Sequence, residues 1–90
     1  MNIETIRRKV AAGHYQLTQH AKDEGADDDM DMADVESILL TGKLVETLTK
    51  DVRGTRYIVA GLTPDKRVGR IVCRMLPSGK LRIITMYLEG

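Results

Sequence analysis

Residues 70–88 read RIVCRMLPSGKLRIITMYL, and this stretch decides the fold. Both of its arms are rich in β-branched and other apolar residues, whereas residues 77–80 supply the Pro, Ser and Gly of a turn. The stretch therefore predicts a β-hairpin with strands at Arg70–Leu76 and Leu81–Leu88.

Two earlier segments show the same period of two. Lys43–Lys50 alternates along its length, and Arg56–Leu62 contains three consecutive β-forming residues, Tyr, Ile and Val. A Thr-Pro-Asp-Lys turn at 63–66 leads from the second of these segments toward the hairpin. Four strands joined by short connections predict an antiparallel meander.

Before Lys43 the apolar period is about 3.6, which is typical of helices. Asn2 and Thr18 are suited to cap the first and second helices, and Asp31 with Asp34 approximates a capping box for a third. The segment 14–18 is too short for a helix, and the pattern assigns it no element. Helices followed by strands predict an α+β domain, with two to three N-terminal helices packed on a four-stranded antiparallel sheet.

Length and composition restrict the class of protein. The chain has 90 residues, 42% of them apolar, and a single cysteine, Cys73. No run approaches the roughly 18 apolar residues of a membrane helix, and the N-terminus lacks a signal-peptide pattern. We therefore expect one domain over residues 1–90, no membrane association and a reducing cytoplasm.

The charge is divided between the two halves of the chain. Residues 1–42 carry four basic and nine acidic side chains, whereas residues 43–90 carry ten basic and four acidic ones. The net charge of +1 is thus the sum of −5 and +6. The helical half is acidic and the sheet half is basic.

The sequence offers no metal or cofactor motif. Asp27, Asp29 and Asp31 alternate as at the start of an EF-hand loop, but Met32 and Ile38 stand where that loop needs Gly and Glu. The cysteine and the two histidines lack the spacing of zinc ligands, and no glycine-rich phosphate loop joins a strand to a helix. We expect neither a metal nor another cofactor.

One histidine is a candidate for proton transfer. His20 falls in the first turn after the Thr18 cap, where the positive end of the helix dipole favours the neutral imidazole that a general base needs. The alternative is a histidine that only hydrogen-bonds the backbone at the start of the helix.

The basic strands are a second candidate site. If the 77–79 turn is a three-residue loop, Arg74 lies opposite Arg82 and Arg70 lies opposite Met86, all on one face. Three arginines on one face can clamp phosphates. The alternative is a solvated face with nothing bound. Three tyrosines and no Phe or Trp argue against a platform for stacking bases.

Several short motifs occur in order along residues 15–88. They are Tyr15-x-x-Thr18-x-His20-Ala21, Asp34-Val35, Gly42-x-Leu44-Val45-Glu46, Tyr57-Ile58-Val59-x-Gly61 and Ile83-Ile84-Thr85-x-Tyr87. The set resembles a bacterial family known only as a domain of unknown function. Its members are similar to RelE/ParE-type toxins and share the fold of barnase, EndoU and colicin-type ribonucleases.

This resemblance implies a RelE-like fold and metal-independent cleavage of RNA, with a separate antitoxin-like protein as a partner. A base removes the proton of the ribose 2′-hydroxyl, cations stabilise the phosphorane and an acid protonates the leaving oxygen. The resemblance implies His20 as base or acid, Arg70 or Arg74 as phosphate clamps, and Thr85 and Tyr87 as site residues on the last strand.

The chain departs from this family on its second helix. The family carries arginines where this chain has Glu24 and Asp28. In a regular strand, moreover, Thr85 and Tyr87 face away from Arg82. Either the RNA site lies elsewhere on the sheet, or this chain has lost its nuclease activity and kept the fold. A second hypothesis is a non-enzymatic interaction module that pairs its acidic half with a basic partner or with a second copy in a homodimer. A third hypothesis is a nucleic-acid binder without chemistry.

Overall fold

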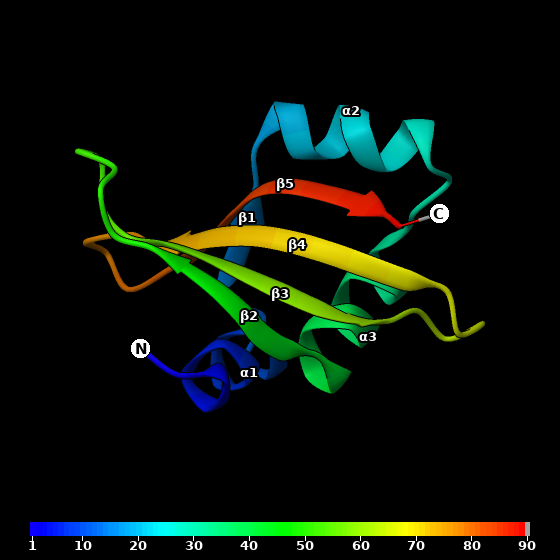
Figure 1. Ribbon diagram of the computed structural model, residues 1–90, viewed down its shortest axis with the longest axis horizontal. Coiled ribbons are helices and arrows are strands. Elements are labelled where there is room, and N and C mark those ends of the chain that lie inside the picture. The colour runs from blue at the N-terminus through cyan, green and yellow to red at the C-terminus, as the bar shows by residue number, and fades with distance from the viewer. Residues whose placement is uncertain (90) are drawn as a thin grey trace.

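The computed structural model of the chain describes residues 1–89, which form helices and one twisted sheet (Figure 1). The helices are α1 (Ile3–Ala11), α2 (Gln19–Asp27) and α3 (Met32–Thr41). The strands are β1 (Tyr15–Leu17), β2 (Lys43–Leu48), β3 (Arg56–Leu62), β4 (Val68–Met75) and β5 (Leu81–Leu88). The two strands of the deciding hairpin begin and end within two residues of their predicted bounds.

The sheet has the strand order β1-β5-β4-β3-β2. Strands β2 to β5 are antiparallel neighbours, whereas β1 pairs in parallel with β5, Tyr15 lying opposite Leu81. The expected α+β class is confirmed, but the sheet is mixed and five-stranded instead of antiparallel and four-stranded. The missed strand has only three residues, too few to show a period of two.

The helices begin where their caps predict. The Asn2 side chain accepts a hydrogen bond from the Thr5 backbone N–H at 3.1 Å, and Thr18 accepts one from the Ala21 N–H at 3.1 Å. At α3 both bonds of a capping box form, from the Asp34 N–H to the Asp31 carboxylate and from the Asp31 N–H back to the Asp34 carboxylate. Each cap satisfies backbone donors that the first turn of a helix leaves free.

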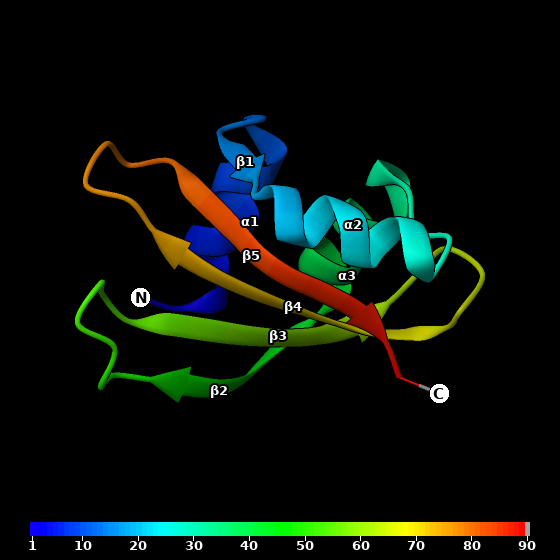
Figure 2. The same cartoon turned by 90° about the horizontal axis from the view of Figure 1, so that it is seen from above.

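All three helices lie on one side of the sheet (Figure 2). Between them and the sheet is the core, whose fully buried members from α3, β3 and β4 include Val35, Ile38, Val59 and Ile71. The opposite surface of the central strands carries no helix, and we call it the helix-free face. Within residues 1–89, no helix has both the length and the apolar character needed to cross a membrane.

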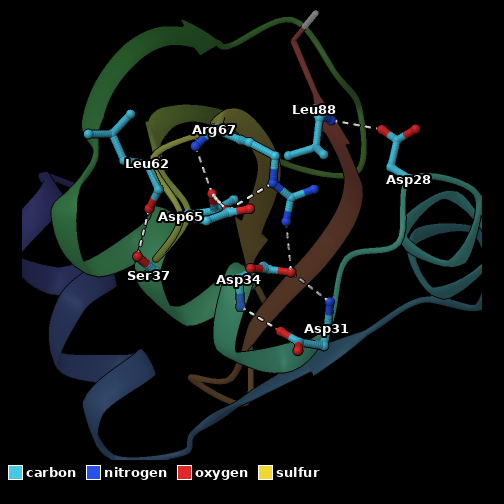
Figure 3. A network of polar contacts seen from close by, with 9 residues as sticks. Asp28, Asp31, Asp34, Ser37, Leu62, Asp65, Arg67 and Leu88 are labelled. Atoms are coloured by element: carbon cyan, nitrogen blue, oxygen red, sulfur yellow. Dashed lines mark hydrogen bonds and ion pairs between the residues drawn. The ribbon is translucent and has the colours of Figure 1, made fainter.

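Helix α2 covers the part of β5 that β1 leaves unpaired. At one end the Thr18 hydroxyl donates to the Ile84 carbonyl at 3.1 Å. At the other end the Leu88 N–H donates to Asp28 Oδ2 at 2.8 Å, as Figure 3 shows. The two side chains satisfy backbone groups at a strand edge that would otherwise be open.

A β-bulge changes which residues of β4 and β5 share a face. Val72 pairs with Thr85 and Cys73 pairs with Ile83, so Ile84 is an extra residue in β5. Arg74 lies opposite Arg82, as predicted. The predicted pairing of Arg70 with Met86 is wrong, because the bulge shifts the register by one residue and places Tyr87 opposite Arg70.

Candidate functional site

The bulge brings the candidate residues of the two last strands to one surface. Three cross-strand pairs follow one another on the helix-free face: Arg74 with Arg82, Val72 with Thr85, and Arg70 with Tyr87. The residues that alternate with them, such as Ile71, Cys73 and Met86, are buried in the core on the other side. The expectation that Thr85 and Tyr87 face away from Arg82 is therefore wrong, since it assumed a regular strand.

The three pairs form a row along the strands. Successive residues on one face of a strand are about 6.6 Å apart, so the row extends over about 13 Å. It joins a doubly basic end, at Arg74 and Arg82, to an end with one arginine and a phenol, at Arg70 and Tyr87.

The three predicted arginines differ in their partners. Arg70 donates from Nε to the Glu89 carboxylate. Arg74 is buried, with 7% of its surface exposed, and its guanidinium lies 3.2 Å from Asp51 Oδ2. The Arg82 side chain is exposed, and its guanidinium forms no hydrogen bond or ion pair within the part of the chain that the structure describes.

Asp51, in the loop 49–55 between β2 and β3, is the centre of an arginine cluster. Its carboxylate lies 3.4 Å from Arg53 Nε, 3.3 Å from Arg56 Nε and 3.2 Å from Arg74 Nη2. The backbone N–H of Arg53 also donates to it at 2.9 Å, and this bond does most to lower the pKa of Asp51. Because the guanidiniums of Arg53 and Arg74 act in the same direction, against the effect of burial, the carboxylate stays ionised.

A pocket of about 260 Å³ opens beside this cluster. It is lined by Thr18, Arg53, Arg74, Leu76, Arg82 and Ile84. Sequence reasoning found Arg74 and Arg82 but missed Arg53, because the path of a seven-residue loop decides where its side chain lies. A larger hollow of about 580 Å³ lies within the same loop and shares Arg53 with the pocket.

His20 lies in the first turn of α2, as predicted. Its Nε2 is 3.0 Å from Glu24 Oε1, one helical turn later, and 67% of its side chain is exposed. Glu24 therefore places a carboxylate beside the imidazole. The contacts of the described residues do not link His20 to Tyr87 or to the arginines, but Thr18 binds Ile84 beside Thr85 and so brings the start of α2 to the row.

The acidic stretch before and within α3 is largely used by the fold (Figure 3). Asp34 is buried in its capping box and lies 3.6 Å from the guanidinium of Arg67 in the turn before β4. Arg67 also bonds to Asp65 at 2.9 Å, and the pKa of Asp65 is lowered first by the Thr63 hydroxyl and then by Arg67. Part of the charge of the acidic half is thus neutralised by the basic half of the same molecule.

Other reactive groups do not gather into a site. Among residues 1–89, no three His, Cys, Asp or Glu side chains are placed to hold a metal ion together. Cys73 is fully buried against the helices, and burial raises the pKa of its thiol to about 12. A thiol that remains protonated at neutral pH is a poor nucleophile.

Comparison with known proteins gives a family but no characterised relative. No curated protein and no solved structure matches the chain. One family model matches residues 17–88, a region that begins at the end of β1 and includes His20, the arginine cluster and the row on the helix-free face. The chain therefore belongs to the family of the domain of unknown function DUF4258.

Proposed function

We propose that the chain is a metal-independent endoribonuclease of the RelE-like, toxin–antitoxin type, with the helix-free face as its RNA site. The observation that carries this proposal is the β-bulge at Ile84. It gathers Arg70, Arg74, Arg82, Thr85 and Tyr87 on one face, although a regular strand would divide them. Cations can stabilise a phosphorane, and a phenol beside them can donate a proton, in phosphodiester cleavage without a metal.

The proposed reaction is an attack within the RNA strand. A base takes the proton of a ribose 2′-hydroxyl, the 2′-oxygen bonds to the adjacent phosphorus, and the bond to the 5′-oxygen breaks. The leaving oxygen takes a proton from an acid, and a 2′,3′-cyclic phosphate remains. Tyr87 is suited to donate this proton, and Arg70 on the neighbouring strand is suited to stabilise the phosphorane.

His20 is the proposed base. Its Nε2 lies 3.0 Å from Glu24 Oε1, which leaves Nδ1 as the nitrogen available to take a proton. This is the arrangement in which a carboxylate orients a catalytic imidazole. Glu24 would then support the chemistry of the site, although the resembling family has an arginine at this position.

Incubation with RNA in EDTA tests the proposal. The wild type is expected to cleave, and loss of a general acid or base should slow cleavage by about 100-fold or more in His20→Ala and in Tyr87→Phe. His14→Ala is the matched control, because His14 contacts Lys9 of α1 and is not among the residues that line the arginine pocket. Absence of cleavage across RNAs of different sequence, or full activity in both site variants, would contradict the proposal.

A specific observation also favours a non-enzymatic interaction module. Three candidate groups already have carboxylate partners within the chain: Arg70 has Glu89, Arg74 has Asp51 and His20 has Glu24. In this second proposal the fold binds an antitoxin-like protein or a second copy and performs no chemistry. Light scattering at low and high salt tests the homodimer, and a monomer in both conditions would exclude it.

A further inference from the structure

The arginine cluster around Asp51 has more positive charge than it can neutralise internally. Four guanidiniums gather there and share a single carboxylate, that of Asp51; they belong to Arg53, Arg56, Arg74 and Arg82. Three of the four contact Asp51, and Arg82 contacts no acid within residues 1–89. Like charges in one place repel, so the cluster favours any anion that enters it.

The pocket beside the cluster is suited to a phosphate group. Arg53 reaches it from the loop, Arg74 from β4 and Arg82 from β5, and its volume is about 260 Å³. Guanidinium presents its donors in a planar fork that matches two oxygens of a phosphate. The Thr18 hydroxyl and the apolar side chains of Leu76 and Ile84 complete the wall.

The Asp51 carboxylate positions the cluster without blocking it. It holds Arg74, which is 7% exposed, and it fixes the turn through the Arg53 backbone N–H. The Arg53 side chain itself remains 77% exposed. Arg53 and Arg82 can therefore bind a solvent-borne anion, and Arg74, which Asp51 holds in place, lies in the wall of the same pocket.

The pocket lies at the opposite end of the row from Tyr87. It contains the Arg74–Arg82 pair, two pairs away from the Arg70–Tyr87 pair, and this separation is about 13 Å along the strands. That is larger than one phosphate group, so a strand cleaved near Tyr87 would place a different phosphate in the pocket.

We propose that Arg53, Arg74 and Arg82 form a phosphate subsite that holds single-stranded RNA at a phosphate distant from the bond that is cleaved. This inference rests on the proposed function, because it takes RNA as the ligand of the helix-free face. It adds Arg53, from the loop 49–55, to the residues that bind RNA, and it gives the exposed Arg82 an RNA phosphate as its partner.

The test uses a ligand that cannot be cleaved. Fluorescence polarisation would measure binding of a labelled 2′-O-methyl RNA oligonucleotide, which lacks the attacking hydroxyl, over a range of salt concentrations. Arg53→Ala and Arg82→Ala should each weaken binding by about 10-fold, the lower end of the range for a hydrogen bond to a charged group. Each should also reduce the slope of log affinity against log salt by about 0.7, the value for one phosphate contact of a single strand.

Arg8→Ala is the matched control. It removes the same charge from an exposed position on α1, on the helix-covered side of the sheet, and should leave binding and slope unchanged. Thermal melting would show that the variants are folded. Wild-type affinity in Arg53→Ala and Arg82→Ala, an equal loss in Arg8→Ala, or no binding by the wild type would each overturn the subsite.

The phosphate subsite and the proposed RNA cleavage can be refuted independently of each other. If the arginine variants bind weakly and the wild type does not cleave RNA in EDTA, the subsite stands and the proposed cleavage is wrong. If the wild type cleaves and the arginine variants bind the oligonucleotide normally, the cleavage stands and the subsite is wrong.

Discussion

Asp28, the acid that caps the C-terminal end of α2, forms a contact with β5 whose structural role can be tested directly. Its carboxylate accepts the Leu88 N–H at 2.8 Å and is half-buried at the end of α2. Asp28→Ala leaves that N–H without its partner at the edge of β5. A hydrogen bond to a charged group is worth about 1.5–3 kcal/mol, and partial exposure lowers the expected loss of unfolding free energy to about 1–2 kcal/mol.

Urea denaturation would measure this loss, with Asp27→Ala as the control. Asp27 is the preceding residue, is exposed, and carries the same charge at the same helix end, so any effect of the helix dipole is common to both variants. Hydrogen exchange at the Leu88 amide should accelerate in Asp28→Ala alone. Equal stability of the two variants within about 0.5 kcal/mol, with unchanged exchange at Leu88, would refute the structural role.

Two further predictions concern the packing of the sheet and the buried thiol. A Cβ at Gly61 would meet the Ile38 carbonyl and lie 2.8 Å from Gly42 Cα, so Gly61→Ala should lower the free energy of unfolding by about 3 kcal/mol in urea denaturation. Gly54→Ala, whose Cβ would meet no atom within 4 Å, should lower it by only about 1 kcal/mol. Equal losses in the two variants would contradict the backbone contact at Gly61. Because burial raises the pKa of Cys73 from 9.0 to about 12, the unfolded chain loses this proton first as pH rises. Between these two pKa values the free energy of unfolding should therefore fall as pH rises, and the fall should be steeper in the wild type than in Cys73→Ala by up to about 1.4 kcal/mol per pH unit. Equal slopes in the two proteins would contradict the raised pKa of Cys73.

Features that depend on neighbouring residues could be predicted from the sequence. The caps at Asn2, Thr18 and Asp31 form as expected, because a cap is decided by a side chain and backbone groups two or three residues away. The opposition of Arg74 and Arg82 was also predictable, since the short turn between their strands sets the local register.

Features that depend on distant segments could not be predicted in this way. The bulge at Ile84 adds a residue where the sequence shows only two consecutive isoleucines between Arg82 and Thr85, and it reverses the faces of Thr85 and Tyr87. β1 forms because its three residues pair with the edge of β5, and so short a segment carries no sequence pattern that indicates this pairing. Arg53 joins the pocket through the folding of its loop around Asp51.

Asp28, which caps the C-terminal end of α2, acts on only one end of the proposed RNA site. Asp28 is anchored at Leu88, beyond Tyr87, whereas the arginine pocket lies at Arg82, six residues earlier in β5 and about 20 Å away along the strand. At physiological salt the screening length is about 8 Å, so repulsion from Asp28 scarcely reaches a phosphate in the pocket. Its effect falls on the Tyr87 end, where cleavage is proposed. Asp28 should therefore weaken catalysis more than RNA binding, and binding and cleavage need to be measured separately.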